Sequence, residues 1–311
     1  FPIRPGTEDL PLDELLDQQW YRLAYWKVGN EELNYRRFFD VDTLAAIRVE
    51  DQSVFDASHA LLLRLYDEGL IEGFRIDHPD GLATPRGYLQ KLHRATGGCW
   101  VVVEKILEPH ETLPVGSRCA GTTGYDALLR VTGLFHDPAE LPRLNELWER
   151  VAGGEGWFGA ALLKAKDEVV RSMLFAEVNR LVSIAVAICE SDVALRDHTR
   201  RELGRAIRAL LINMDRYRAY VEPGLPAPVE ERAVIVEAAD RARPELAEDE
   251  QATLDLIVAL ACGDTRPGEP GGAEDLPPVG STAVTTELPH AAPGVAELRA
   301  QFAIVPQDTI L

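Results

Sequence analysis

The chain has 311 residues, of which 46% are hydrophobic, so it can bury a substantial core as two domains or as one elaborated barrel. Its formal net charge of −19 argues against binding to nucleic acid, because that function depends on clustered Lys and Arg. There is no apolar run of about eighteen residues and no basic segment followed by an apolar one, which predicts no membrane span, no signal peptide and a cytoplasmic protein.

Residues 1 to 50 are predicted to be irregular and rich in aromatic side chains. The chain opens at Phe1 rather than at Met, so we expect it to be a piece of a longer protein. Aromatic residues gather in 20–26 and 34–40, beside Arg and Asp. Such mixtures are typical of sugar binding, because rings cover the apolar faces of pyranoses while charged groups bind hydroxyls. Packing into a core is the commoner use of aromatic clusters, and composition alone favours it.

The following segment predicts alternating helices and strands. Apolar residues at helical spacing indicate a helix over 54–68. A strand over 73–77 follows, and then a helix between Thr84, which can cap it, and Gly97, which can end it. The run 100–105 is predicted to be a second strand, and its valines suit a strand that is covered on both faces, as parallel sheets require.

Asp77 and Glu104 close these two strands, where parallel βα architectures place catalytic side chains. A retaining glycosidase needs one ionised carboxylate as nucleophile and one protonated carboxyl as acid, about 5–5.5 Å apart. Arg75, on the same strand face, would keep Asp77 ionised. Desolvation after three valines would raise the pKa of Glu104. The alternative is that Glu104 caps an edge strand and that Asp77 is an ordinary turn residue.

Four further candidates lie near this pair in the sequence. His78 and Asp80 belong to a turn that would overhang the pocket, where either could hydrogen-bond a sugar hydroxyl, although a lone His at a turn is more often structural. Lys105 should point to the opposite face from Glu104 by strand alternation. The glycine-containing segment 121–126 could bring Tyr125 to a substrate or could form an ordinary turn.

Residues 137 to 262 are predicted to form an all-helical region. The expected helices cover 141–151, 160–190, 199–213, 228–241 and 251–261. The charged residues of this region are interpreted as solvated faces. Residues 263–294 are rich in Gly and Pro and are predicted to be a flexible loop.

Several motifs that follow one another in a fixed order resemble a known family. They occupy residues 21–26, 34–39, 48–51, 73–81, 102–107 and 121–126. In these motifs the chain closely resembles the maltooligosyl trehalose synthase family of the α-amylase superfamily. The resemblance is strong from residue 20 to residue 130 and weaker around 217–221.

The resemblance implies an α/β fold, namely part of a (β/α)8 TIM barrel with a large all-helical insertion after the fifth strand. The fourth strand would carry Asp77 as nucleophile and the fifth Glu104 as acid/base. The implied division is a partial catalytic barrel over 1–136, the helical insertion over 137–262, the loop over 263–294 and a return segment over 295–311.

The implied activity is an intramolecular transglycosylation within maltooligosaccharides. The reducing-end α-1,4 linkage is converted to an α,α-1,1 linkage by a retaining mechanism, which yields maltooligosyl trehalose. The implied substrate-binding residues are Arg75, His78, Asp80, Lys105, Tyr125, Tyr35 and Arg36. No cofactor or metal is implied, and the 4 cysteines lack the spacing of a zinc site or a disulfide framework. A trehalose-releasing hydrolase is the expected functional partner.

The sequence also departs from the family pattern. The early barrel strands and the third catalytic acid, an Asp in a Thr-His-Asp setting, have no counterpart in it. We therefore expect the chain alone to lack normal mutase activity. Two alternatives stay open, an α-amylase-type glycoside hydrolase and a non-catalytic glucan-binding module.

Overall fold

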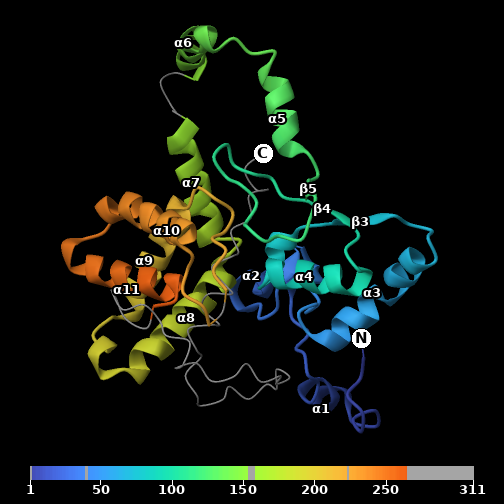
Figure 1. Ribbon diagram of the computed structural model, residues 1–311. Coiled ribbons are helices and arrows are strands. Elements are labelled where there is room, and N and C mark those ends of the chain that lie inside the picture. The colour runs from blue at the N-terminus through green and yellow to red at the C-terminus, as the bar shows by residue number, and fades with distance from the viewer. Residues whose placement is uncertain (1, 39–40, 153–157, 223, 265–311) are drawn as a thin grey trace.

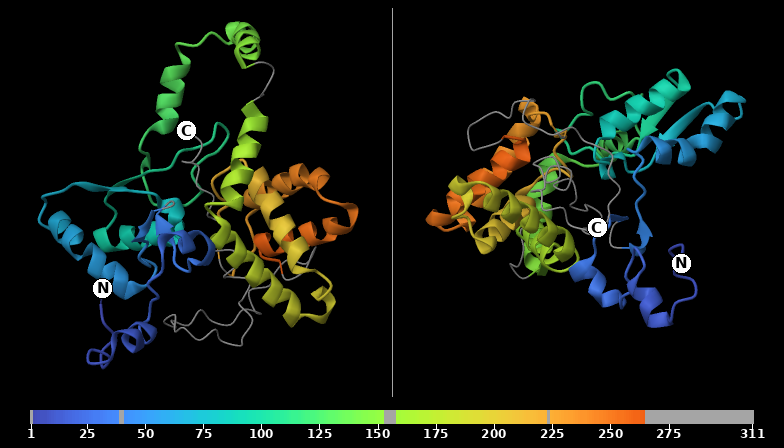
Figure 2. Two further views of the ribbon diagram at one scale, coloured as in Figure 1. Left: turned by 180° about the vertical axis from the view of Figure 1, so that it is seen from behind. Right: turned by 90° about the horizontal axis from the view of Figure 1, so that it is seen from below.

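The computed structural model describes residues 2–38, 41–152, 158–222 and 224–264. It is a mixed structure of helix and sheet with two separate hydrophobic cores. A helical bundle formed by α8 to α11 lies beside a small sheet with its two covering helices, and α5 and α6 project away from both (Figures 1 and 2). The predictions for 263–294 and 295–311 concern residues outside the described part, apart from Gly263 and Asp264.

The N-terminal fifty residues contain more regular structure than the sequence predicts. They form α1 (Leu12–Asp17), a short 3-10 turn (Trp26–Val28), α2 (Gly29–Glu32) and an antiparallel pair of strands, β1 (Arg37–Phe38) and β2 (Val41–Ala45). The rings of Trp20, Tyr25 and Trp26 are each more than half exposed, so the expectation that they pack into a core is wrong for these three.

The predicted order of helix, strand, helix and strand is confirmed in the next segment. The elements are α3 (Gln52–Asp67), β3 (Gly73–Ile76), a 3-10 turn (Pro79–Gly81), α4 (Pro85–Thr96) and β4 (Trp100–Val103). A third strand, β5 (Gly121–Thr122), was not expected, because the sequence predicts only a loop or a turn there. The three strands are parallel in the order β3-β4-β5.

Side chains from both covering helices form the small core of this sheet. Its buried members are Phe55, Phe74, Tyr88, Leu89, Leu92, Val101 and Val103. Val102 is half-buried, so the strand is covered fully on one face only. Gly73 is required where β3 begins, since a Cβ there would lie 2.4 Å from the carbonyl oxygen of Trp100. Thr84 stands at the start of α4 as predicted, but its side chain makes no capping hydrogen bond.

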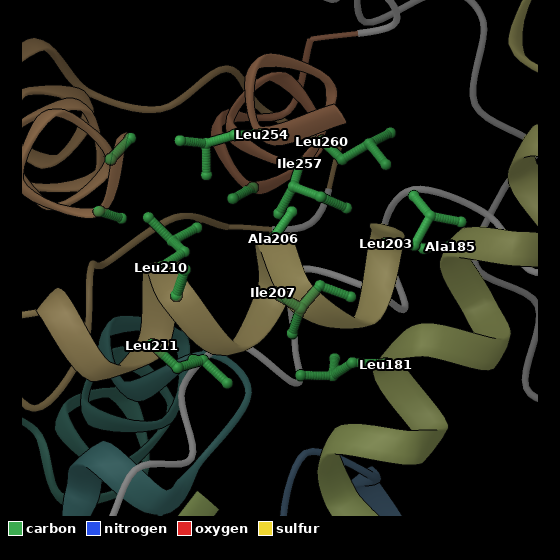
Figure 3. Packing of buried hydrophobic residues seen from close by; sticks show 14 of the residues in the cluster. Leu181, Ala185, Leu203, Ala206, Ile207, Leu210, Leu211, Leu254, Ile257 and Leu260 are labelled. Atoms are coloured by element: carbon green, nitrogen blue, oxygen red, sulfur yellow. The ribbon is translucent and has the colours of Figure 1, made fainter. Parts of the chain in front are cut away.

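The second region is helical. After α5 (Tyr125–Gly133) come α6 (Leu141–Ala152), α7 (Phe158–Arg171), α8 (Phe175–Ser191), α9 (Arg200–Asn213), α10 (Val229–Ala242) and α11 (Gln251–Cys262), with 3-10 turns at Pro138–Glu140, Val193–Leu195, Arg243–Glu245 and Glu248–Glu250. Helix α9 lies at the centre, where its Leu203, Ile207 and Leu210 meet side chains of α8 and α11 (Figure 3). This core is the larger of the two.

One predicted helix, 160–190, is divided in the structure. The break lies between α7 and α8, which meet at a bend of 74°. The backbone carbonyl of Met173, in the break, accepts a hydrogen bond from the buried guanidinium of Arg37. The sequence pattern of 160–190 is helical throughout, so it does not predict the break. The break coincides with the contact between Met173 and the distant Arg37.

The interpretation of the charged residues in this region as solvated is wrong for several of them, including Glu177, Glu250 and the buried Arg218. Glu177 is largely buried and pairs with Arg37 at 3.3 Å, and Glu250 is buried and pairs with Arg205 at 2.7 Å. Among the described residues, no single helix is both long and apolar enough to cross a membrane, and α7 with α8 meet that criterion only together, across their bend.

Candidate active site

The two predicted catalytic residues follow adjacent parallel strands. Ile76 of β3 is in register with Val103 of β4, and the next residues are Asp77 and Glu104. The backbone N–H of Glu104 donates to the carbonyl oxygen of Ile76 at 2.8 Å, which continues the strand pairing by one residue. Both side chains therefore leave the same edge of the sheet, where parallel strands bring functional groups together.

Arg75 joins the two carboxyls. Its Nη1 donates to Oδ1 of Asp77 at 2.6 Å, and its Nη2 lies 3.3 Å from Oε1 of Glu104. The Glu104 carboxyl also accepts a hydrogen bond from the backbone N–H of His78 at 3.4 Å. The expected separation of about 5–5.5 Å between the carboxyl groups stays a prediction.

The environments of the two carboxyls move their pKa values in opposite directions. Burial, together with the hydrogen bond to Asp77 and the charge of Asp77, raises the pKa of Glu104, which confirms the predicted direction. Burial also acts to raise the pKa of Asp77, but hydrogen bonds with Arg75 and Glu104 and the charge of Arg75 outweigh it, so the pKa of Asp77 is lowered. Two carboxyls whose pKa values are moved apart can act as a nucleophile and an acid.

The site is open to solvent. The exposed fractions of the side chains are 55% for Asp77, 28% for Glu104 and 51% for Arg75. Ion pairs at such exposure contribute little to stability, so the value of this arrangement lies in the ionisation states that it sets.

The turn after β3 carries His78, whose backbone φ of 41° lies in the left-handed region. Its ring Nε2 lies 2.7 Å from the hydroxyl of Tyr217, and its ring meets that of Phe38 edge to face at 6.2 Å. Gly81 lies so close to the His78 ring that a Cβ at this position would be 2.6 Å from Nδ1. The imidazole is thus held between Gly81 of its own turn and two distant residues, Phe38 and Tyr217.

Asp80 and Lys105 form an ion pair with each other and not with Asp77 or Glu104. Nζ of Lys105 lies 2.9 Å from Oδ2 of Asp80 and 2.9 Å from Oε1 of Glu111, and all three side chains are buried. The hydroxyl of Tyr220 donates to the Asp80 carboxylate, and the buried Arg218 donates to the Asp80 carbonyl at 2.9 Å. Asp80 and Lys105 also line a cavity of about 420 Å³ between the sheet and the segment 216–231.

The remaining candidates lie at different distances from the pair. Tyr125 is half-exposed at the start of α5 and interacts electrostatically with Arg75. Desolvation by burial lowers the pKa of Arg36, and Glu50 and Tyr217 are among its neighbours. The hydroxyl of Tyr35 donates to the carbonyl oxygen of Asp42, in the N-terminal pair of strands. The structure thus gathers Arg75, His78 and the two carboxyls, whereas Asp80 and Lys105 pair with each other and Tyr35 bonds within the N-terminal strands.

Sequence reasoning did not assign three residues that complete the site. Tyr217, Arg218 and Tyr220 all come from the segment between α9 and α10, yet they bind the turn after β3. The weak resemblance around 217–221 was the available signal. No local pattern tells which distant turn such residues bind.

The described residues offer no group of three or more His, Cys, Asp or Glu side chains arranged to hold a metal ion. No disulfide joins Cys99, Cys119, Cys189 and Cys262, all of which belong to the described residues. Burial raises the pKa of Cys119 and of Cys189, which makes them less nucleophilic.

The chain matches known proteins in sequence and in structure, although no family model matches it. A protein of Mycobacterium tuberculosis assigned as a maltooligosyl trehalose synthase is 38% identical over 218 residues, which are 70% of this chain and 27% of that protein. The chain therefore spans about a quarter of the length of this relative.

Solved structures agree with the sequence match. Maltooligosyltrehalose synthase from Arthrobacter ramosus superposes with a TM-score of 0.74 and 32% identity, over 97% of this chain and 34% of that chain. A hypothetical maltooligosyl trehalose synthase from Sulfolobus tokodaii, at 24% identity and a TM-score of 0.61 over 84% of this chain and 34% of that chain, supports the fold alone. Sequence and structure together place this chain in the maltooligosyl trehalose synthase family, as a chain that corresponds to part of the length of its relatives.

Proposed function

We propose that the protein catalyses an intramolecular transglycosylation on maltooligosaccharides. The reducing-end α-1,4 linkage becomes an α,α-1,1 linkage, so the product is a maltooligosyl trehalose. The relatives in sequence and structure carry the name of this activity. The single observation that carries the proposal is the pair of Asp77 and Glu104, which Arg75 bridges. The pKa of Asp77 is lowered and the pKa of Glu104 is raised from its ordinary value.

Both steps of the proposed reaction use these two carboxyls. In the first step an oxygen of the Asp77 carboxylate attacks the anomeric carbon, the bond to the glycosidic oxygen breaks, and Glu104 gives its proton to that oxygen. In the second step the anomeric hydroxyl of the freed glucose loses its proton to Glu104, its oxygen attacks the same carbon, and Asp77 departs. Two inversions retain the α configuration, and the overall change is an isomerisation.

The proposed architecture is part of a (β/α)8 barrel. The parallel order β3-β4-β5 and the helix α4 between β3 and β4 support it. We assign residues 1–136 to the catalytic barrel and residues 137–262 to a helical insertion. Two separate hydrophobic cores, one on each side of this division, support the assignment.

The proposal includes seven substrate contacts. They are Arg75, His78, Asp80, Lys105, Tyr125, Tyr35 and Arg36. Ring and guanidinium groups can bind the apolar faces and the hydroxyls of sugars, respectively. The net charge of −19 suits a neutral substrate and disfavours a polyanion. A hydrolase that releases trehalose from the product is the proposed functional partner.

The proposal is tested by trapping the covalent intermediate. α-Maltosyl fluoride needs no acid to release fluoride, so a Glu104→Gln variant can still be glycosylated at Asp77 but lacks the base for the second step. We expect intact mass to rise by one maltosyl group and peptide mapping to place it on Asp77. The double variant Asp77→Asn, Glu104→Gln is the control and should stay unlabelled.

A reaction with maltopentaose then separates the possible activities. The proposed mutase removes reducing ends without releasing glucose, and Asp77→Asn abolishes turnover while binding of maltopentaose persists. Labelling of a residue other than Asp77, or an Asp77→Asn variant that still turns over, would contradict the proposal.

The second candidate is an α-amylase-type hydrolase. The exposure of the pair favours it, because a mutase must keep water from the glycosyl intermediate while the freed glucose turns. Hydrolysis would increase the number of reducing ends in the same reaction. A glucan-binding module would bind maltopentaose, form no covalent intermediate and be unaffected by Asp77→Asn.

A further inference from the structure

The turn after β3 has a backbone conformation that needs support. His78 is the single non-glycine residue of the described chain with a φ in the left-handed region. This conformation directs its backbone N–H at Oε2 of Glu104, 3.4 Å away. Left-handed backbone is unfavourable for a residue with a Cβ, so it persists only where the surroundings hold it.

The side chain of Arg218 binds backbone carbonyls of this turn. Its side chain is buried, and its Nη1 donates to the carbonyls of Asp80 at 2.9 Å and Leu82 at 2.6 Å, while Nη2 donates to that of Ala83 at 3.4 Å. The guanidinium thus contacts three carbonyls of one short segment. Lysine could not reproduce this fork, because its ammonium is a single point of donation.

Tyr220 and Asp80 connect the same turn to the segment after β4. The Tyr220 hydroxyl donates to Oδ1 of Asp80, and Oδ2 of Asp80 lies 2.9 Å from Nζ of Lys105. Lys105 directly follows Glu104 in the chain. The Tyr220 ring also lies 5.7 Å from that Nζ and 5.3 Å from the Arg218 guanidinium, so it packs between both cations.

We propose that Arg218 and Tyr220 are positioning residues for the catalytic pair. They join the turn that follows Asp77 to the residue that follows Glu104, and so hold the two carboxyls in one mutual placement. Neither touches the reacting atoms. The inference rests on the proposed roles of the two carboxyls and assigns Asp80 and Lys105 a task besides substrate contact.

The test removes one hydroxyl and compares it with a matched control. Tyr220→Phe keeps the ring between the two cations and removes only the donor to Asp80. Tyr88→Phe is the control. The Tyr88 hydroxyl also bonds a buried side chain, because it lies 2.8 Å from Nε2 of His59, but this contact belongs to the core of the sheet. A merely structural role predicts that both variants lower the melting temperature and leave the catalytic pair unchanged.

The backbone N–H of His78 provides the reporter, because its chemical shift follows the ionisation of Glu104. Labelling with carbonyl-13C Asp and 15N His leaves amide signals from the two Asp-His bonds of the sequence, Asp77-His78 and Asp197-His198. The second is an internal control, in the segment before α9. The groups facing Glu104 are Arg75, Asp77 and His78, and a Glu104→Gln variant shows which step of the His78 signal belongs to Glu104.

We expect Tyr220→Phe to lose most of the Glu104 step in the His78 signal, while the His198 signal stays as it is in the parent chain. Tyr88→Phe should leave both signals as they are in the parent chain. The proposal is overturned if Tyr220→Phe retains the parent titration of His78, or if Tyr88→Phe changes it equally.

Asp80→Asn provides a second variant in case Tyr220→Phe does not fold. This variant keeps the side-chain shape and an oxygen that can accept from Tyr220. It removes the charge that pairs with Lys105, so we again expect the Glu104 step in the His78 signal to be lost. This experiment reads no product. A chain that shows the loss but never carries sugar on Asp77 would refute the proposed function and leave the positioning of the pair supported.

Discussion

At the scale of single residues, one guanidinium makes the two carboxyls unequal. Arg75 lies closer to Asp77, at 2.6 Å, than to Glu104, at 3.3 Å. It therefore favours the ionised form of Asp77, while burial and the neighbouring Asp77 raise the pKa of the less exposed Glu104. The contact between Arg75 and Asp77 follows from strand alternation and is visible in the sequence, whereas the contact with Glu104 depends on strand pairing.

Arg75→Met should shift the acidic limb of Asp77 glycosylation to higher pH. The folded-state pKa of Asp77 is lowered, so removing the guanidinium raises it and leaves less carboxylate at a given acidic pH. The measurement is the rate of labelling by α-maltosyl fluoride across pH. Arg64→Met, at an exposed pair with Glu68 on α3, is the control and should leave the limb in place. An unshifted limb in Arg75→Met would refute this role.

At the scale of elements, local signals determine where helices begin, and distant contacts determine where some of them break. Helix α9 begins with a capping box, in which Thr199 accepts from the backbone N–H of Glu202 and the Glu202 carboxylate accepts from that of Thr199. Both partners lie within four residues, so the sequence predicts this start. The break between α7 and α8 involves Arg37, and no local pattern predicts it.

Thr199→Ala should lower the free energy of unfolding by about 1 kcal/mol, because it leaves a backbone N–H of α9 without its cap. Thr199→Ser keeps the hydroxyl and should remain close to the parent. Urea unfolding followed by circular dichroism measures both. Equal losses in the two variants would indicate that the methyl group of Thr199 matters and the cap does not.

At the scale of the whole molecule, stability is distributed unequally between two cores. The larger core belongs to α7 to α11 and surrounds α9, whereas the core of the sheet is small (Figure 3). The proposed catalytic pair follows two strands of the sheet, and the residues that bind the turn after β3 come from the helical side, between α9 and α10. The larger core thus supports a site that it does not contain.

Ile207→Ala should therefore destabilise the chain strongly. Ile207 is fully buried at the centre of α9, and its truncation leaves a cavity that typically costs about 2–5 kcal/mol. Leu134→Ala is the control, because Leu134 is 82% exposed and its removal should change stability by less than about 0.5 kcal/mol. The free energy of unfolding in urea is the measurement, and similar values for both variants would contradict the assignment of α9 to the centre of the core.

The sequence by itself determined the short-range features of this protein. It predicted α3, β3, α4 and β4, the positions of Asp77 and Glu104 at strand ends, and most helices of the second region. Periodicity, caps and strand alternation act within a few residues, so they can be read from one segment at a time. The motifs carried the family resemblance for the same reason.

The tertiary structure alone decided which segments meet. It paired β5 with β4, divided the predicted helix 160–190, and brought Arg218 and Tyr220 to a turn more than a hundred residues away in the chain. It also buried Lys105 between the carboxylates of Asp80 and Glu111. Such contacts form only when whole surfaces pack against each other. Because the partners lie far apart in the chain, no single local pattern encodes which residues are buried or which charges pair.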